Sequence, residues 1–87
     1  MIYRVELSRN ARKALVALPV ADQRRVERAI DGLARNPRPH GAKKLEGGAG
    51  EFRVRVGAYR ILYDINDGVL CVLVLAVGPR KDVYRRR

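Results

Sequence analysis

The stretch Phe52-Arg53-Val54-Arg55-Val56-Gly57-Ala58-Tyr59-Arg60-Ile61-Leu62-Tyr63 predicts a β-hairpin with one apolar and one basic face. Strand side chains alternate between the two faces of a sheet, so Arg53 and Arg55 point away from the apolar face of Phe52, Val54 and Val56. Gly57-Ala58 fits a two-residue turn with glycine at its first central position. The returning strand then places Arg60 on the basic face. Like charges on neighbouring strands repel, so we expect this face to bind an anion.

The residues before the hairpin predict a strand followed by two helices. Residues 2–7 alternate in polarity, which indicates a strand with one buried face. Ser8 is a suitable N-cap for a helix over roughly residues 9–17. Pro19 suits the first turn of a second helix, whose apolar residues follow helical spacing. Asn36-Pro37-Arg38-Pro39 ends that helix, and residues 37–50 are predicted to form a loop.

The residues after the hairpin predict one further strand. Asn66-Asp67-Gly68 is a strong turn signal. Residues 69–77 are apolar on both faces, as is typical of a central strand, and Gly78-Pro79 ends it. The order β-α-α-β-β-β predicts a single α+β domain over residues 1–87, with a flexible basic tail at about 85–87. We expect an antiparallel sheet with a two-helix hairpin on one face, and an open face that carries the arginines above an apolar floor of Leu62, Val72 and Val74.

The charge of the chain limits its partners. It has 19 Lys and Arg against 9 Asp and Glu, a net charge of +10 and a pI near 10.9. This balance favours nucleic acid, a ribonucleoprotein, an acidic protein or an anionic membrane as partner. The cations are mostly arginine, which suits bidentate phosphate contacts, although a GC-rich genome would also enrich arginine.

The cysteine and apolar content point to the cytoplasm. Cys71 is alone, so no disulfide forms within the chain, which fits a reducing compartment. No signal peptide is evident, and no apolar run approaches the roughly 20 residues that span a bilayer. No His, Cys or carboxylate cluster has metal-ligand spacing, so we expect no metal and no cofactor. His40 lies in a Pro/Gly loop and is expected to be exposed.

The element order and three motifs together resemble the RelE/ParE toxin superfamily, and within it the RelE branch. The motifs are Lys43-Lys44-Leu45, residues 52–63, and Val77-Gly78-Pro79-Arg80-Lys81-Asp82-Val83-Tyr84. The resemblance covers nearly the whole chain. It implies the toxin of a toxin–antitoxin pair, a ribosome-dependent and metal-independent endoribonuclease that cuts mRNA in the ribosomal A site. The catalytic residues that it implies here are Arg53, Arg55, Arg60, Arg80 and Tyr84.

The chemistry of RNA cleavage suggests a role for each of these residues. The 2′-hydroxyl is the nucleophile, and preorganised cations stabilise the charge that develops on the phosphate. We expect Arg60 and Arg80 to clamp the scissile phosphate, while Arg53 and Arg55 hold it and its neighbours. Tyr84 is the candidate base, because surrounding guanidinium groups would lower its pKa.

The proton donor and the outer RNA contacts are less defined. Arginine is effectively never deprotonated, so the general acid remains open, with a water or a ribosomal RNA group as candidates. Further RNA contacts are expected from Lys43, Lys44 and Lys81, with a plain solvated loop as the alternative for the first two.

Other interpretations of the same residues remain. Arg53 and Arg55 could form a solvated strand face paired with Glu46, Glu51 or Asp64, and Tyr84 could be a packing residue. The chain could also be a ParE-like toxin that inhibits DNA gyrase by protein binding, or a catalytically degenerate nucleic-acid-binding homologue. The resemblance further implies a cognate antitoxin as partner, besides the ribosome and mRNA. Operator DNA would be bound only through the antitoxin, and no membrane partner is expected.

Overall fold

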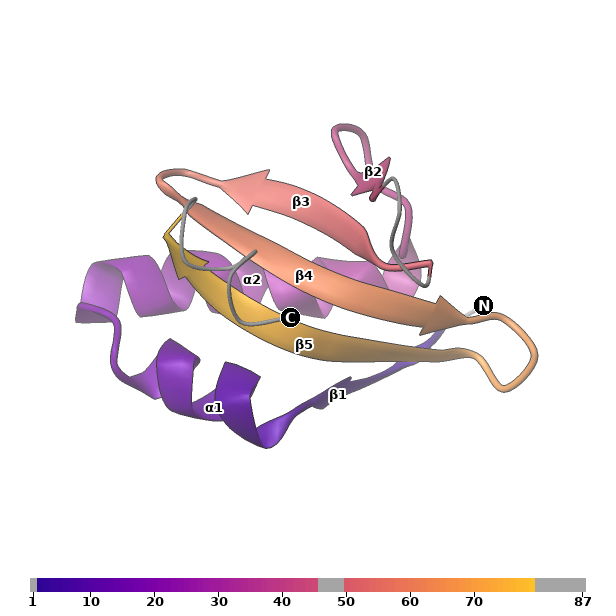
Figure 1. Cartoon of the computed structure of the whole chain (residues 1–87), viewed down its shortest axis with the longest axis horizontal. Helices are drawn as coiled ribbons and strands as arrows, with labels where there is room; N and C mark the ends of the chain where they lie inside the picture. The colour runs from indigo at the N-terminus through magenta and orange to yellow at the C-terminus, as the bar shows by residue number, and fades with distance from the viewer. Residues whose placement is uncertain (1, 46–49, 80–87) are drawn as a thin grey trace.

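The computed structural model describes residues 2–45 and 50–79, and in these two ranges it shows two helices on one face of a mixed sheet (Figure 1). The spatial order of the five strands is β1-β5-β4-β3-β2. The α+β class and the predicted succession of elements are confirmed. Their bounds are β1 Arg4–Leu7, α1 Arg9–Val16, α2 Val20–Arg35, β2 Lys43–Lys44, β3 Phe52–Val56, β4 Tyr59–Asn66 and β5 Cys71–Pro79.

The sheet departs from the prediction at both of its edges. β1 pairs with β5 in parallel, with Arg4 opposite Cys71 and Leu7 opposite Val74, so the expectation of a wholly antiparallel sheet is wrong for this pair. No tight turn joins the two strands, and residue alternation within a strand does not determine the direction of its neighbour. At the other edge, Lys43–Lys44 forms the short strand β2 against β3, where a loop was expected.

The two helices begin and end close to the predicted positions. Ser8 is the N-cap of α1, since its Oγ accepts a hydrogen bond from the Ala11 N–H at 3.1 Å. The same hydroxyl donates to the Leu75 carbonyl at 2.9 Å, which ties the start of α1 to β5. Pro19 precedes the first residue of α2, and Asn36 is the C-cap, as the proline-rich sequence predicts.

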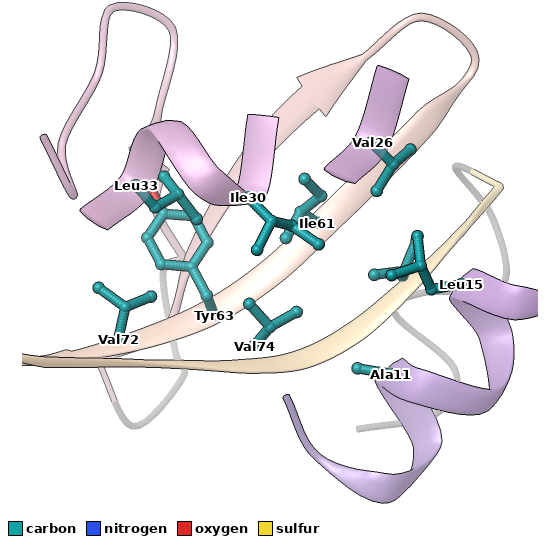
Figure 2. Packing of buried hydrophobic residues seen from close by; sticks show 10 residues of the cluster. Ala11, Leu15, Val26, Ile30, Leu33, Ile61, Tyr63, Val72 and Val74 are labelled. Carbon is teal, nitrogen blue, oxygen red and sulfur yellow. The ribbon is translucent and has the colours of Figure 1, made fainter. Parts of the chain in front are cut away.

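The core lies between the helices and the sheet (Figure 2). Both helices and the two central strands contribute buried residues that point toward one another, among them Ala11, Leu15, Val26, Ile30, Leu33, Ile61, Tyr63, Val72 and Val74. The Tyr63 side chain is fully buried, and its hydroxyl donates a hydrogen bond to the Pro37 carbonyl at 2.8 Å. Burial raises the pKa of Tyr63 to about 12.

The apolar floor of the open face differs from the prediction because β5 contains a β-bulge. Leu62 lies opposite Ala76, but the next residue, Tyr63, lies opposite Val74, so Leu75 is an extra residue in β5. Beyond the bulge the alternation of β5 changes phase relative to β4. Val74, like Val72, therefore packs in the helix-side core and not on the open face. On the open side, Ala76 takes the place next to Leu62.

Candidate functional site

The three hairpin arginines lie on the face of the sheet that the helices leave open. β3 and β4 are antiparallel, with Arg55 directly opposite Arg60 and Arg53 opposite Leu62. Gly57 has a φ of +59°, which a glycine adopts without strain and which the predicted turn requires. Arg60 is only 4% exposed, Arg53 is half-buried and Arg55 is exposed. The three arginines differ in burial, so their guanidinium groups lie at different depths of one surface.

β2 adds one lysine to this surface. Lys43 lies opposite Arg53 in the antiparallel register, so both residues belong to the open face, whereas Lys44 lies opposite Phe52. Phe52 packs against the helix-side core. The structure therefore brings Lys43 to the arginines and does not bring Lys44 there.

These cations line one depression on the open face. An open pocket of about 300 Å³ is lined by Gly41, Lys43, Arg53, Arg55 and Arg60. Four positively charged side chains converge on this space from three neighbouring strands, as far as the described residues show. Such preorganised donors suit an oxyanion, since guanidinium groups present several N–H donors in a fixed plane.

An apolar floor lies beside the arginines. Leu62 is 2% exposed and Ala76 is 8% exposed, and Leu45 packs against this pair. The Leu45 N–H donates to the Glu51 carbonyl at 2.8 Å, which holds Leu45 next to the start of β3. Apolar groups next to a charge lower the local dielectric constant, which strengthens the attraction of a bound anion. Sequence reasoning found Leu62 and missed Ala76, because the bulge is not visible in the apolar pattern of β5.

Several predicted site residues cannot be placed. Arg80, Lys81, Tyr84 and the basic tail at about 85–87 lie outside the described residues.

In residues 2–45 and 50–79, no group of three His, Cys, Asp or Glu side chains could hold a metal ion. His40 is exposed, as predicted.

The described tyrosines of β4 do not suit the role of a base. The Tyr59 hydroxyl donates to Asp22 Oδ2 at 2.9 Å, and this hydrogen bond is the main reason that the pKa of Tyr59 is raised. The pKa of Tyr63 is raised further, by burial. A base near neutral pH needs a lowered phenol pKa, so both residues have a structural role. Tyr59 instead fastens the hairpin to α2.

A charged cluster that the sequence did not suggest lies next to the loop leading to the pocket. Arg38 binds Asp67 through two guanidinium nitrogens, at 2.9 Å and 3.3 Å, and Tyr3 donates its hydroxyl hydrogen bond to the same carboxylate. These hydrogen bonds, that from Arg38 first, lower the pKa of Asp67. Arg38 also lies over the Phe52 ring, 5.4 Å from its centroid. The cluster joins the β4–β5 turn, β3 and the segment before β2, so it helps to fix the position of Lys43.

The comparison with known families decides the class of the protein. A sequence model of the ParE toxin of the type II toxin–antitoxin system parDE matches residues 5–84. The chain belongs to this toxin family. The match includes the helices, the hairpin and the stretch after β5, so it is not limited to one motif.

Relatives of this toxin are named as RelE-type proteins. Toxin RelG of Mycobacterium tuberculosis is 39% identical over 87 residues, which are 99% of this chain and 100% of the relative. In the crystal structure of the RelE–RelB complex of Pyrococcus horikoshii, one chain is 35% identical with a TM-score of 0.81. That match covers 93% of this toxin and 98% of the archaeal chain.

A second solved complex agrees with this assignment. A chain of the toxin–antitoxin complex RelBE2 of Mycobacterium tuberculosis is 33% identical with a TM-score of 0.82, over 92% of this toxin and 93% of that chain. The protein is therefore a toxin of a type II toxin–antitoxin system, and it is of the RelE type within the RelE/ParE superfamily, as its sequence motifs predict.

Proposed function

We propose that this toxin is a ribosome-dependent endoribonuclease that cuts mRNA in the ribosomal A site. The observation that carries the proposal is the pocket in which Lys43, Arg53, Arg55 and Arg60 converge on the open face. Its positive charge, its arginine content and its open shape suit the phosphodiester backbone of a single RNA strand. The RelE-type relatives support the same class of activity.

The proposed reaction uses the 2′-hydroxyl of the RNA as nucleophile. Its oxygen forms a bond to the adjacent phosphorus and the bond to the 5′-oxygen breaks, which leaves a 2′,3′-cyclic phosphate and a free 5′-hydroxyl. Arg60 and Arg55 bind the phosphate oxygens as negative charge grows on them, and Arg53 and Lys43 hold the strand. Arg80 is assigned as a further phosphate ligand and Tyr84 as the base that takes the 2′-hydroxyl proton. The proton for the 5′-oxygen comes from water or from ribosomal RNA.

Arg60, the buried arginine, is expected to contribute the largest share of this catalysis. Arg60 is almost completely enclosed, so its guanidinium is held in place before the substrate arrives. A preorganised donor stabilises the transition state without reorganisation, and removal of one such donor typically lowers a rate by about 10²–10³. The more exposed Arg55 is expected to contribute less, because water screens its charge.

The proposed partners follow from the same surface. The toxin is proposed to act in the cytoplasm and to bind a cognate antitoxin, as the RelE chains do in the archaeal and mycobacterial complexes. An acidic antitoxin segment laid over the basic pocket would exclude RNA by occupying its phosphate-binding groups. Operator DNA would be bound through the antitoxin alone. No helix in the described part of the chain is long and apolar enough to cross a membrane.

Cleavage on programmed ribosomes tests this proposal. Purified toxin is added to ribosomes that carry a defined mRNA with an empty A site, and primer extension maps the ends that form. We expect a cut within the A-site codon, a 2′,3′-cyclic phosphate on the upstream fragment, and no cut in the same mRNA without ribosomes. Arg60→Ala should lower the single-turnover rate by about 10²–10³. Arg35→Ala on the exposed side of α2 removes the same charge and should leave the rate within about twofold.

A ParE-like action on DNA gyrase is the second candidate function. It is favoured by one observation, namely that the matching family model describes a ParE toxin. Gyrase supercoiling is measured with the same preparations of toxin. Intact mRNA on ribosomes together with blocked supercoiling would replace the nuclease proposal with this one. If neither activity is present, the protein is better described as a catalytically degenerate nucleic-acid-binding homologue.

A further inference from the structure

A second depression lies next to the arginine pocket on the hairpin. It has a volume of about 270 Å³ and is lined by Arg55, Gly57, Ala58, Tyr59 and Arg60. The two depressions share Arg55 and Arg60, which face each other across β3 and β4. The first continues toward Lys43 of β2, and the second continues toward the turn at Gly57-Ala58. The shared pair of guanidinium groups therefore lies between two neighbouring anion-accessible spaces.

The spacing along β3 matches a nucleic-acid strand. Arg53 and Arg55 lie two residues apart in β3, so their side chains follow one another on the open face at an interval of about 6.8 Å, and the Gly57-Ala58 turn lies just beyond the end of the strand. This interval is of the order of the step from one phosphate to the next in an extended RNA strand. One guanidinium has five N–H donors in a plane, so Arg55 or Arg60 can donate to a phosphate on either side.

A further cationic side chain, that of Arg25, lies at the hairpin turn. Arg25 of α2 reaches the turn, and its Nη1 is 3.1 Å from the position that a Cβ on Gly57 would occupy. The absence of a side chain at Gly57 thus permits the guanidinium to approach the backbone that lines the second depression. The positive charge of the open face consequently extends around the end of the hairpin to the first turns of α2.

We infer that the second depression is a binding subsite for the phosphodiester adjacent to the one in the arginine pocket. Its ligand is a single RNA strand that lies along β3, from Lys43 toward the Gly57-Ala58 turn, with Arg25 as a charge at the far end. The inference rests on the proposed function in one respect, namely that RNA is the ligand of the arginine pocket. To that function it adds the path of the RNA strand along β3 and a second contact point, neither of which the catalytic assignment needs.

Binding of short, uncleavable RNA tests the subsite without ribosomes or catalysis. The probes are 2′-O-methyl oligonucleotides without terminal phosphates, with one, two or three phosphodiesters, and binding is followed by NMR titration at low ionic strength. We expect the second phosphodiester to tighten binding by about fivefold, the upper range for one exposed charge contact, and the third to add less than twofold. Equal gains from the second and third phosphodiesters, or no detectable binding of the two-phosphodiester probe, overturn the inference.

A pair of isosteric variants at the exposed turn residue provides the matched control. Ala58→Asp places an anion in the second depression, whereas Ala58→Asn has nearly the same shape and no charge. Both residues suit this turn position, and equal thermal unfolding midpoints will show that both variants fold. We expect Ala58→Asp to abolish the gain from the second phosphodiester and Ala58→Asn to retain it. Equal behaviour of the two variants overturns the subsite.

The role of Arg25 is tested in the same titrations. Arg25→Gln should reduce the gain from the second phosphodiester, while Arg35→Gln, with the same loss of charge about 15 Å further along α2, should not. Equal effects of both variants would assign Arg25 to the general charge of the protein and remove it from the subsite. These outcomes are separate from the cleavage assay, because a toxin that fails to cut mRNA on ribosomes can still show or lack the stepwise gain in binding.

Discussion

Tyr63→Phe is expected to make the protein less sensitive to alkaline pH. The Tyr63 hydroxyl is buried, donates to the Pro37 carbonyl at 2.8 Å, and has a pKa raised to about 12, against about 10 in an unfolded chain. Above pH 10 the unfolded state loses this proton before the folded state does, so stability falls as pH rises. The contribution of Tyr63 is fully present below pH 10 and is lost as pH approaches 12.

The size of the effect follows from these two pKa values. Near pH 8 the variant loses a neutral buried hydrogen bond, which makes it about 1 kcal/mol less stable than the wild type. Between pH 8 and pH 11 the wild type loses about 1.4 kcal/mol through the ionisation of Tyr63 in the unfolded state, and the variant loses none of this. The difference in stability between the two proteins is therefore expected to vanish at about pH 10.7 and to have reversed in sign by pH 11.

Urea unfolding at a series of pH values measures this difference. The other tyrosines and the lysines titrate in both proteins, so subtraction of the two stability curves isolates Tyr63. Parallel curves from pH 8 to pH 11 would refute the reasoning, since they would mean that Tyr63 ionises equally in the folded and unfolded states. The result bears on the site, because the Tyr63–Pro37 bond fixes the start of the segment that leads to Gly41 and Lys43.

Three further predictions concern the elements that position the open face. Ser8→Ala removes the N-cap of α1 and the link to Leu75, and urea unfolding should show a loss of about 1–2 kcal/mol, against no loss for Asn10→Ala on the exposed side of α1. Gly57→Ala should lower the free energy of unfolding by about 1–2 kcal/mol, because Gly57 has a positive φ. Gly32→Ala, in open space on α2, should raise it by about 0.5–1 kcal/mol. Equal shifts in the unfolding midpoints of the two variants would contradict this account. Leu62→Ala should cost about 2–5 kcal/mol and weaken RNA binding, and unchanged calorimetric stability would show that the apolar floor is not closely packed.

The hairpin and its arginines were predictable from the sequence. Alternation between Arg53 and Arg55 is a local property of one strand, and the turn at Gly57 sets the register of the next. Local geometry alone places Arg60 on the same face as these two arginines, and the observed register agrees with this. The helix boundaries were predictable for the same reason, since Ser8 and Pro19 act on their own neighbouring backbone groups.

The apolar floor was only partly predictable. The bulge at Leu75 arises from pairing with β4, and a run of apolar residues carries no mark of an inserted residue. Val74 was therefore assigned to the wrong face, and Ala76 was missed. Similarly, the link between Arg38 and Asp67 joins segments far apart in the chain, and neither residue has a neighbour in sequence that indicates its partner.

By itself, the sequence determined the class of the fold, the order of its elements, the basic face of the hairpin and the resemblance to RelE-type toxins. Each of these depends on short-range rules of alternation, capping and turn formation, or on motifs in a set order. Only the tertiary structure decided that β1 lies parallel to β5, that Lys43 but not Lys44 joins the arginines, and that Arg55 and Arg60 separate two depressions. These features depend on pairing between distant strands, where burial of the whole core selects the register and direction that no single segment specifies.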